Sequence, residues 1–569
     1  MSNINTLYNH LFSADQRRNF LFLIFLMVIA SILDLLGISL IIPLVNKFFK
    51  IENNSESFLE NLLFNNELIR STSLFELLII FFAIFAIKFF YLIFYYYFQN
   101  KFIFSFRAKL TANLFERALL DDYKKIKKNS GQSLNLLTNE VDQVTNYLSA
   151  VSFLLLEAVL ISFIVIFLLI YEFKFSLFLI FTFITILFFY FTLFKKKIDR
   201  WGSERLNSAN KRLQYINEGV KGNQTIKLFS IENLILNKFN LHNESLRTNS
   251  IKINLLNQFP KIFLEFFAII FLIIIIYYNY QTNADFNYIV SFVGVFLFAF
   301  FKLVPSLNRF MGSAQNMRYN NVSVNLALQE QGNLIKKKKS NNKIDFKNEF
   351  ILKVKNFKYD KSNENYLLKD IELEIKKNQK IGLVGPSGVG KSTILDFITG
   401  LINPKADEII LDGKTLKNLD QWQNIIGFVP QKIFILEETL KENIAFGLKI
   451  ADENQRIFRD VIEKANLTNL VEKLSLKENS VIEEDGKNLS GGEIQRIGIA
   501  RALMRKPKIL IMDEATSALD FKNEREIIDD LIKIHDLTII FVTHRISSLE
   551  KFDKVYSLEN GVIEEKKFS

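Results

Sequence analysis

The sequence contains no cysteine among its 569 residues. This absence excludes disulfide bonds, thiolate metal sites and cysteine nucleophiles, and it agrees with a catalytic part that lies in the cytosol. A signal-peptide cleavage site is also lacking. The first apolar segment, at 20–45, is too long for the core of a signal peptide and carries no small-residue cleavage motif. We therefore expect this segment to be retained.

Charge of one sign is in excess, since the formal net charge is +11. Such an excess could indicate a nucleic-acid partner. The Lys and Arg residues, however, concentrate in the connections beside long apolar segments. We interpret the charge as a sign of membrane topology and expect no nucleic-acid partner.

Six apolar segments are long enough to cross a bilayer: 20–45, 74–98, 151–171, 175–194, 262–280 and 288–304. The long connections between them are basic, whereas the short connections at 172–174 and 281–287 carry one Lys between them. The positive-inside rule then places both termini in the cytoplasm. The polar composition of 101–148 and 195–261 predicts that the helices continue beyond the membrane. A small external helix is expected within 51–73.

Charged residues inside the predicted spans are costly, at about 3 kcal/mol each near the bilayer centre. Lys88 and Lys302 lie at similar depths, and Lys261 and Arg309 lie near the cytoplasmic ends of their spans. These four residues predict a basic cavity that binds an anionic group of the substrate. Two alternatives remain open: snorkelling, above all for Lys261, or burial in ion pairs. The candidate acidic partners are Asp34, Glu157 and Glu265.

The composition changes sharply towards the second half of the chain. Residues 1–332 form the predicted transmembrane domain, and 333–348 form a polar linker with four successive Lys at 336–339. From 349 to 569, strand-like and helix-like patterns alternate, which is typical of an α/β domain. We therefore predict an all-α membrane domain of six helices followed by an α/β domain.

A glycine-rich loop stands between the apolar run 381–384 and the helix-like run 394–398. Its residues are Gly385, Pro386, Ser387, Gly388, Val389, Gly390, Lys391, Ser392 and Thr393, which match GxxxxGK[ST]. In this pattern, backbone N–H groups surround the phosphates, the Lys reaches the terminal phosphates, and the hydroxyl at 392 binds Mg²⁺. The alternative is an ordinary turn before a helix. We predict an ATP-binding site.

Two further stretches supply the groups that this chemistry needs. The buried-strand pattern 509–512 ends in Asp513, which would hold Mg²⁺ through water, and Glu514, which would polarise the attacking water. About twenty residues earlier, a helix begins whose N-terminal end would favour a phosphate. Its first residues are Ser490, Gly491, Gly492 and Glu493.

These motifs together resemble those of ATP-binding cassette (ABC) exporter half-transporters, and the resemblance covers nearly the whole chain. Residues 489–493, LSGGE, resemble the ABC signature; Gln431 matches the Q-loop, Asp520 the D-loop, His544 the switch histidine and Tyr359 the adenine-stacking aromatic residue. The resemblance implies ATP and Mg²⁺ as cofactors and a homodimer with two shared ATP sites. It also implies catalytic roles for Lys391, Gln431, Glu514 and His544, and metal binding by Ser392, Gln431 and Asp513.

A narrower resemblance concerns the membrane domain. Residues 37–43, 258–261 and 301–309 are similar to the bacterial flippase of lipid-linked oligosaccharides used in protein N-glycosylation. That resemblance implies a pyrophosphate-bearing substrate in the bacterial inner membrane. The flippase has Arg where this chain has Lys88, Lys261 and Lys302, and Lys lacks the bidentate fork that suits phosphate. A multidrug or lipid A-type exporter, and an ATP-gated channel or receptor, remain alternatives.

Overall fold

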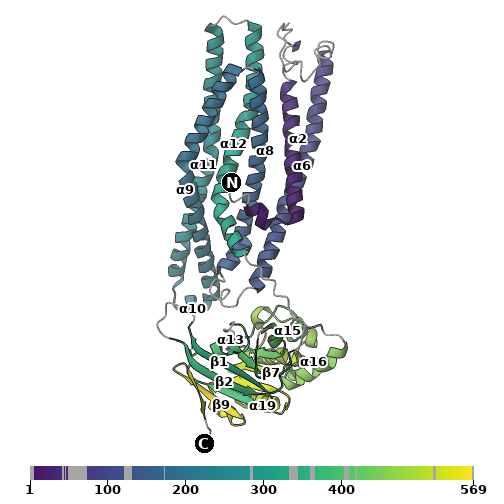
Figure 1. Ribbon diagram of the computed structural model, residues 1–569, viewed down its shortest axis with the longest axis vertical. Helices are drawn as coiled ribbons and strands as arrows, with labels where there is room; N and C mark the ends of the chain where they lie inside the picture. Colours follow the sequence, from purple (N-terminus) through teal and green to yellow (C-terminus); the bar gives the residue numbers. More distant parts are fainter. Residues whose placement is uncertain are drawn as a thin grey trace. The chain divides into compact units, whose positions relative to one another are not determined.

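The computed structural model describes residues 6–40, 44, 47–48, 73–120, 131–171, 173–281, 286–331, 344–358, 366–402, 409–416, 419–449, 452–516 and 521–566. It divides into two compact units that meet in sequence at residues 334 and 335. We call them the helical unit and the α/β unit and describe each by itself (Figure 1). Nearly all of the predicted external helix at 51–73 and most of the predicted linker at 333–348 lie outside the described residues.

The helical unit contains six long helices, drawn as the purple to teal ribbons of Figure 1. They are α2 (Ala14–Ser39), α6 (Leu74–Leu120), α8 (Val141–Tyr171), α9 (Phe173–Lys221), α11 (Glu232–Gln281) and α12 (Phe286–Gln331), with the short elements η1 (Leu7–Leu11), η2 (Leu136–Glu140) and α10 (Asn223–Leu228). Six helices of the described chain are long and apolar enough to cross a membrane. The prediction of six membrane helices is therefore confirmed.

Four of these helices are far longer than a membrane is thick. α6, α9, α11 and α12 contain 47, 49, 50 and 46 residues. At 1.5 Å per residue each measures about 70 Å, whereas the hydrocarbon core of a bilayer is about 30 Å thick. The predicted helical extensions are thus present. α2 ends at Ser39, and residues 41–43 and 45 of the predicted first span lie outside the described residues.

Two apolar clusters hold the helical unit together. One joins α2, α6 and α8 and contains Leu23, Tyr95 and Phe106; the other joins α8, α9, α11 and α12 and contains Phe271 and Phe296. α8 and α12 contribute to both clusters and pack extensively on each other. This pair therefore connects the two halves of the unit.

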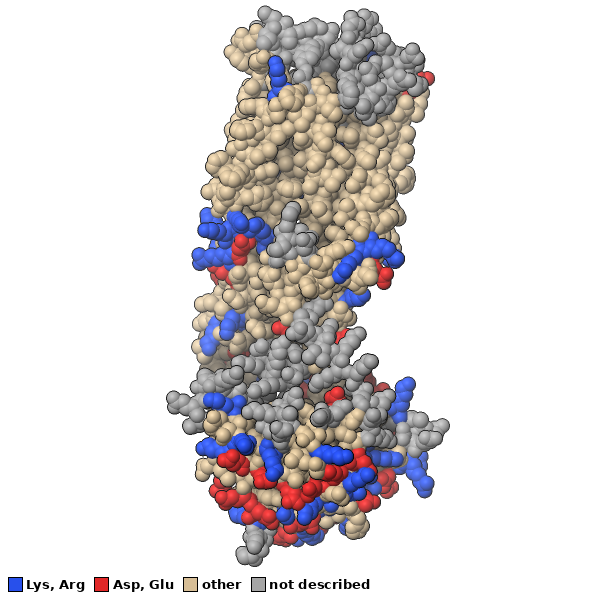
Figure 2. Space-filling view, viewed as in Figure 1, with Lys and Arg blue, Asp and Glu red and all other residues tan. Residues whose placement is uncertain are grey.

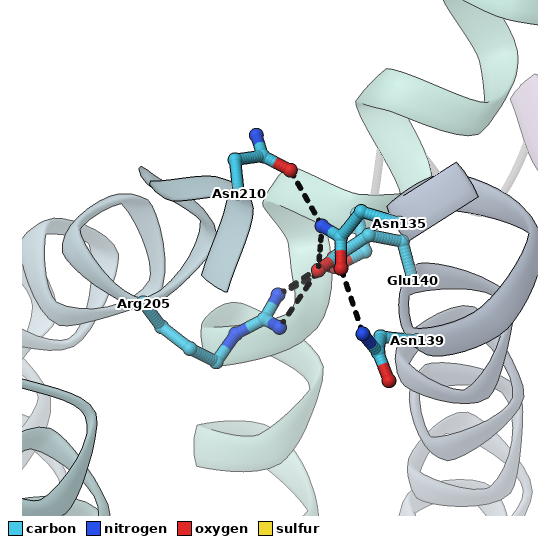
Figure 3. A network of polar contacts seen from close by, with 6 residues as sticks. Asn135, Asn139, Glu140, Arg205 and Asn210 are labelled. Carbon is cyan, nitrogen blue, oxygen red and sulfur yellow. Dashed lines mark hydrogen bonds and ion pairs between the residues drawn. The ribbon is translucent and has the colours of Figure 1, made fainter. Parts of the chain in front are cut away.

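A buried polar network crosses the packed helices where η2 meets α9 and α12 (Figure 3). Arg205 on α9 donates two hydrogen bonds to the Glu140 carboxylate, of 3.2 and 3.0 Å, and a third of 2.7 Å to the Ser323 hydroxyl on α12. Asn135 donates to Asn210 at 2.6 Å and to Glu140 at 3.3 Å. Glu140, Asn135 and Ser323 are completely buried. Three helices are thereby fixed in one relative register.

The α/β unit contains two sheets. The larger has the strand order β10-β9-β3-β8-β7-β6, and the smaller has the order β2-β1-β4-β5. The strands of the larger sheet are β3 (Lys380–Val384), β6 (Ile426–Val429), β7 (Ile509–Asp513), β8 (Thr538–Val542), β9 (Lys554–Glu559) and β10 (Val562–Lys566); those of the smaller are β1 (Glu349–Phe357), β2 (Leu368–Lys376), β4 (Ile409–Leu411) and β5 (Lys414–Thr415). In the larger sheet only the pairing of β10 with β9 is antiparallel. The predicted α/β fold is confirmed.

The central strands are continuous apolar runs because they are covered on both faces. Every residue of β3 and β8 is buried. The covering helices are α13 (Lys391–Ile398), α14 (Leu419–Gln423), α15 (Leu440–Ala445), α16 (Asp452–Lys464), α17 (Thr468–Lys473), α18 (Gly491–Met504) and α19 (Phe521–Ile532), with the 3₁₀ turns Lys477–Asn479, Glu484–Gly486 and Ile546–Leu549. Because β3, β6, β7 and β8 run parallel, their carboxyl ends lie at the same edge of the sheet. The predicted catalytic residues Gln431, Glu514 and His544 follow within two residues of the ends of β6, β7 and β8, and Lys391 begins the helix after β3.

Candidate functional site

The glycine-rich loop connects β3 to α13, as the sequence predicts. Gly385, Gly388 and Gly390 have φ angles of 154°, 80° and 115°, a region that disfavours residues with a side chain. A Cβ atom at Gly385 would lie 2.4 Å from the carbonyl oxygen of Leu558, which no rearrangement of a side chain could relieve. The glycines are therefore required by the course of the backbone.

Lys391 is the first residue of α13, and its side chain folds back onto the loop. Its ammonium group donates hydrogen bonds of 2.7 and 2.9 Å to the carbonyl oxygens of Gly385 and Pro386. Burial lowers the pKa of Lys391, and the nearby carboxylates of Glu514 and Asp513 oppose this shift. The loop thus holds a cation at its centre, next to the N-terminus of a helix, which is the arrangement that binds phosphate.

Ser392 and Asp513 lie next to each other, although 121 positions separate them in the sequence. The Ser392 side chain is hydrogen-bonded to the Asp513 carboxylate. Burial raises the pKa of Asp513, and so does the charge of Glu514, while Ser392 and Lys391 act in the opposite direction. A hydroxyl and a carboxylate oxygen are ligands that Mg²⁺ accepts together with nucleotide phosphates. Among the described residues no group of three or more His, Cys, Asp and Glu side chains could hold a metal by itself.

Three predicted catalytic side chains meet at the end of β7. Gln431 donates a 2.7 Å hydrogen bond to one oxygen of Glu514, and Nε2 of His544 lies 2.8 Å from the other oxygen. Glu514 has a φ angle of 50°, and its backbone N–H donates a 3.0 Å bond to the carbonyl oxygen of Val542 on β8. Such a conformation is strained for a residue with a side chain and is common at active sites. The carboxylate is therefore held from both sides.

The predicted signature segment begins α18. Ser490 is the residue before the helix, and it forms a capping box with Glu493: the N–H of Glu493 donates to the Ser490 hydroxyl at 3.3 Å, and the Ser490 N–H donates to the Glu493 carboxylate at 2.7 Å. Burial favours a higher pKa for Glu493, but the bonds from Ser490 outweigh it and lower the pKa. Glu493 is thus a structural cap. Gly491 and Gly492 form the first turn behind it.

Arg501, on α18, was not identified from the sequence. Its guanidinium donates to the carbonyl oxygens of Phe434, at 2.7 Å, and Asn443, at 2.9 Å. Burial lowers the pKa of Arg501 to about 10. Because Phe434 follows Gln431 by three residues, Arg501 links the signature helix to the segment that carries Gln431. Nothing in the local motif indicates this contact, which depends on tertiary packing. Tyr359 and Asp520 lie outside the described residues.

In the helical unit, the structure brings three of the four predicted cations into ion pairs. Lys88 is buried and donates to Asp34, and Lys302 lies 3.3 Å from the same oxygen of Asp34. Arg309 pairs with Glu157 and donates a 3.3 Å bond to the Ser306 hydroxyl. The pairing partners Asp34 and Glu157 are those that the alternative interpretation named. Glu265 and Lys261 are both exposed, and Lys261 lies just before the apolar run of α11.

In two of the three ion pairs the acid is less exposed than the cation, whereas Lys88 and Asp34 are about equally buried. The side chain of Glu157 is 3% exposed whereas that of Arg309 is 51% exposed, and the values are 12% for Asp34 and 26% for Lys302. Three cations face two carboxylates in this cluster, which leaves an excess of one positive charge. The accessible part of the Lys302–Asp34 and Arg309–Glu157 pairs is therefore the positive part.

Two family models match the chain. The model of the ABC transporter transmembrane region matches residues 20–306, and the ABC transporter model matches residues 368–517. The chain belongs to the ABC transporter family. The first match lies in the helical unit of this ABC transporter, and the second lies in its α/β unit.

Several curated relatives are similar to this ABC transporter. It is 29% identical over 383 residues to the lactococcin-G-processing and transport ATP-binding protein LagD of Lactococcus lactis, an alignment that covers 65% of this chain and 53% of that protein. It is 29% identical over 446 residues to the heterocyst differentiation ATP-binding protein HepA of a Nostoc species, covering 77% and 72%. It is 40% identical over 220 residues to the ATP-dependent lipid A-core flippase of Pectobacterium atrosepticum, covering 37% and 36%. The chain thus spans about half of the first relative and about a third of the last.

A solved structure of a bacterial Atm1-family ABC exporter with ATP bound has a TM-score of 0.76 with this chain. The match covers 97% of this chain and 96% of that one, at 19% sequence identity. At this identity the match shows a shared fold. The ABC transporter therefore has the ABC exporter fold over nearly its whole length.

Proposed function

We propose that this ABC transporter is a homodimer that hydrolyses ATP and moves an anionic lipid-linked substrate across the bacterial inner membrane. The substrate class that we propose is a lipid-linked oligosaccharide. Both termini and the α/β unit would lie in the cytoplasm, because the long basic connections indicate that side of the membrane.

The observation that carries the substrate class is the depth of the charges around Asp34 and Glu157. A ligand that approaches this cluster meets the partly exposed cations Lys302 and Arg309, since both carboxylates lie beneath them. Cations inside membrane segments normally face a partner or a cavity. Here each has an acidic partner, yet one positive charge remains in excess. A phosphate or pyrophosphate group can neutralise this excess, whereas a hydrophobic cation would add to it.

The α/β unit supplies the groups for ATP hydrolysis. The glycine-rich loop and Lys391 would bind the phosphates, and Ser392 and Asp513, with Gln431 close by, would hold Mg²⁺, which neutralises phosphate charge when bound. Glu514 would accept a proton from the attacking water, while Gln431 and His544 orient its two oxygens. Ser490 and the first turn of α18 would contact the nucleotide held by a second copy, so each site needs two chains. These are the roles that the ABC transporter family assigns to the residues at the corresponding motif positions.

A lipid A-type or multidrug exporter is the alternative. A relative at 40% identity is named a lipid A-core flippase, and other relatives are named multidrug resistance transporters. Lipid A also presents phosphate groups, so the excess positive charge suits it as well. A multidrug exporter would be expected to accept hydrophobic cations, which this cluster disfavours. A purely ATP-gated channel would not need the carboxylate arrangement around Glu514.

Reconstitution into liposomes tests the proposal. Fluorescent lipid-linked oligosaccharide, lipid A and a cationic dye are offered separately, and ATP-dependent appearance in the opposite leaflet is measured. We expect the first to be moved. ATP-dependent movement of lipid A or the dye with no movement of the lipid-linked sugar would contradict the proposed substrate.

The cation cluster is tested with three variants. K88A/K302A alone would leave Asp34 buried without a partner, so the triple variant D34N/K88A/K302A is compared with D34N and with K101A, which changes an exposed lysine on the same helix. We expect the triple variant to lose transport while it keeps basal ATP hydrolysis. K101A should keep both activities, and D34N, which leaves Lys88 and Lys302 charged but without their acid, shows how much of any loss comes from breaking the ion pairs alone. Transport at the normal rate in the triple variant would show that these lysines do not bind the substrate.

A further inference from the structure

An apolar groove of about 420 Å³ lies between α9 and α11 in the helical unit. Six of its lining residues are phenylalanines: Phe181, Phe189 and Phe194 of α9, and Phe259, Phe263 and Phe267 of α11. The three residues of α11 follow one another at intervals of four, so they share one helix face. The volume of the groove lies in the range of sites that bind small molecules.

The groove has a fixed floor, which depends on Pro260. A proline has no N–H group, so the carbonyl oxygen of Leu256, four residues earlier, loses its helical donor. The hydroxyl of Tyr190 on α9 donates to this oxygen at 3.1 Å, and the side-chain amide of Gln315 on α12 donates to the same hydroxyl. Tyr190 and Gln315 are buried. Three helices are thus joined beneath the groove, and its shape is determined by specific bonds.

Cations stand at one end of the groove. On α9 the last lining residue, Phe194, is followed directly by Lys195, Lys196 and Lys197, all exposed. The ammonium group of Lys197 lies over the ring of Phe194, at 5.6 Å from its centre. Among the described residues, no ion pair joins these lysines to a carboxylate. Figure 2 shows a wide surface of uncharged side chains on the upper part of the helical unit and, below it, clusters of Lys and Arg with a few acidic residues among them.

We propose that this groove binds one acyl chain of an anionic phospholipid, whose phosphate is held by Lys196 and Lys197. Inside a bilayer, apolar burial alone gives no preference, because lipid chains are as apolar as the groove. The rigid aromatic walls supply a shape that orders one chain, and the lysines select the headgroup charge. A lysine near the membrane surface favours an anionic lipid by about fivefold. The site lies outside the cation cluster around Asp34 and does not depend on which substrate is moved.

Tryptophan quenching by brominated lipids tests this site in the full-length protein. The parent carries Trp201→Phe, which leaves Trp422, completely buried in the α/β unit, as a constant background. Phe189→Trp places a reporter in the groove. Phe188→Trp is the matched control, because it lies one residue away, is 64% exposed against 59% for Phe189, and does not line the groove. Each protein is placed in bilayers of phosphatidylcholine and phosphatidylglycerol in which one lipid or the other carries bromine on its chains.

We expect brominated phosphatidylglycerol to quench the reporter at 189 at least about fivefold more effectively than brominated phosphatidylcholine, since each of the two lysines contributes a preference of about fivefold. The reporter at 188 should show no such preference, and K196Q/K197Q should abolish it at 189. Equal quenching by the two lipids at 189 would overturn the proposal and indicate ordinary surrounding lipid. An equal preference for phosphatidylglycerol at the reporters 188 and 189 would also overturn the proposal, because it would show that the lysines attract anionic lipid to the whole surface and not to the groove. Protection of 189 from both lipids, with 188 quenched, would show that a second copy of the chain fills the groove. Equal melting temperatures of the parent and variant proteins serve as the folding control.

Discussion

The α/β unit and the helical unit place their charged residues by different means. In the α/β unit, Lys391, Asp513 and Glu514 stand at the end of a buried strand, directly after it, or at the start of a helix, so a short stretch of sequence nearly determines their position. In the helical unit, Lys88 and Lys302 reach one acid from helices that are far apart in the sequence. A local motif therefore reveals the chemistry of the first unit, whereas only packing reveals the charge balance of the second.

The largest expected effect is on ATP turnover, when Glu514, which directly follows β7, is substituted. Glu514→Gln keeps the shape of the side chain but removes the proton acceptor, so ATP turnover should fall by about 10²- to 10⁴-fold. Phosphate release by the reconstituted protein measures it, and Glu526→Gln, at an exposed position of α19, is the control. Turnover in E514Q within a few-fold of the parent would show that another group accepts the proton, and motif position would no longer predict the chemistry.

The next effect concerns the buried network of the helical unit. Arg205→Met leaves Glu140 completely buried without its cation, which should cost about 3–5 kcal/mol of stability. The midpoint of thermal unfolding in detergent measures the loss. Arg200→Met is the matched control, since Arg200 pairs with Glu204 on the exposed face of the same helix, and it should cost less than about 1 kcal/mol.

The double variant E140Q/R205M sharpens this result. It removes both charges, so most of the stability lost in R205M should return. A double variant as unstable as R205M would mean that Arg205 acts mainly through packing, and the contrast between the two units would weaken.

A smaller effect distinguishes two helix caps of the α/β unit that have the same geometry. Ser490 and Thr439 both form capping boxes, with Glu493 and Glu442. Ser490→Ala and Thr439→Ala should each reduce stability by about 1 kcal/mol. Only S490A should also lower ATP turnover, because only Ser490 would contact a nucleotide. Equal turnover in the two variants would argue against a role of the signature segment in the site.

The smallest effect is the pH dependence of Asp412. Burial favours a higher pKa, but the N–H groups of Lys347, Asn348 and Glu349 donate to its carboxylate and hold the pKa below its usual value. An acid with a lowered folded pKa stabilises the protein above its unfolded pKa of about 3.9, and this contribution is lost as the pH falls through the folded pKa. Asp412→Asn should therefore destabilise the α/β unit at pH 7 by less than about 1 kcal/mol, since the amide oxygen still accepts hydrogen bonds.

Trp422 reports this change, because it is buried against Phe350 on the neighbouring strand β1. The difference in unfolding midpoint between D412N and the parent should shrink as the pH is lowered below about 4. Asp536→Asn, at an exposed position in the same unit, is the control. A difference that stays constant from pH 7 to pH 3 would show that the charge of Asp412 is not the cause.

The sequence by itself determined the fold class and most of the predicted ATP site. Period, length and apolar composition predict six membrane helices and an α/β domain, and the predicted catalytic groups lie within contiguous motifs whose backbone geometry is dictated by glycine or by strand ends. Even in the α/β unit, only the structure reveals the contacts of Gln431 and His544 with Glu514, because the ends of three strands meet only in the folded sheet.

Tertiary structure alone decided how the membrane charges are balanced. The sequence left Asp34, Glu157 and Glu265 as equal candidates, and the packing of the helices selected the first two. It also decided the Glu140–Arg205 network and the groove beside Pro260, for which no local pattern exists. The physical reason is that the face of a long helix that meets its neighbours is set by side-chain packing over its whole length, so contacts between distant positions cannot be read from either position alone.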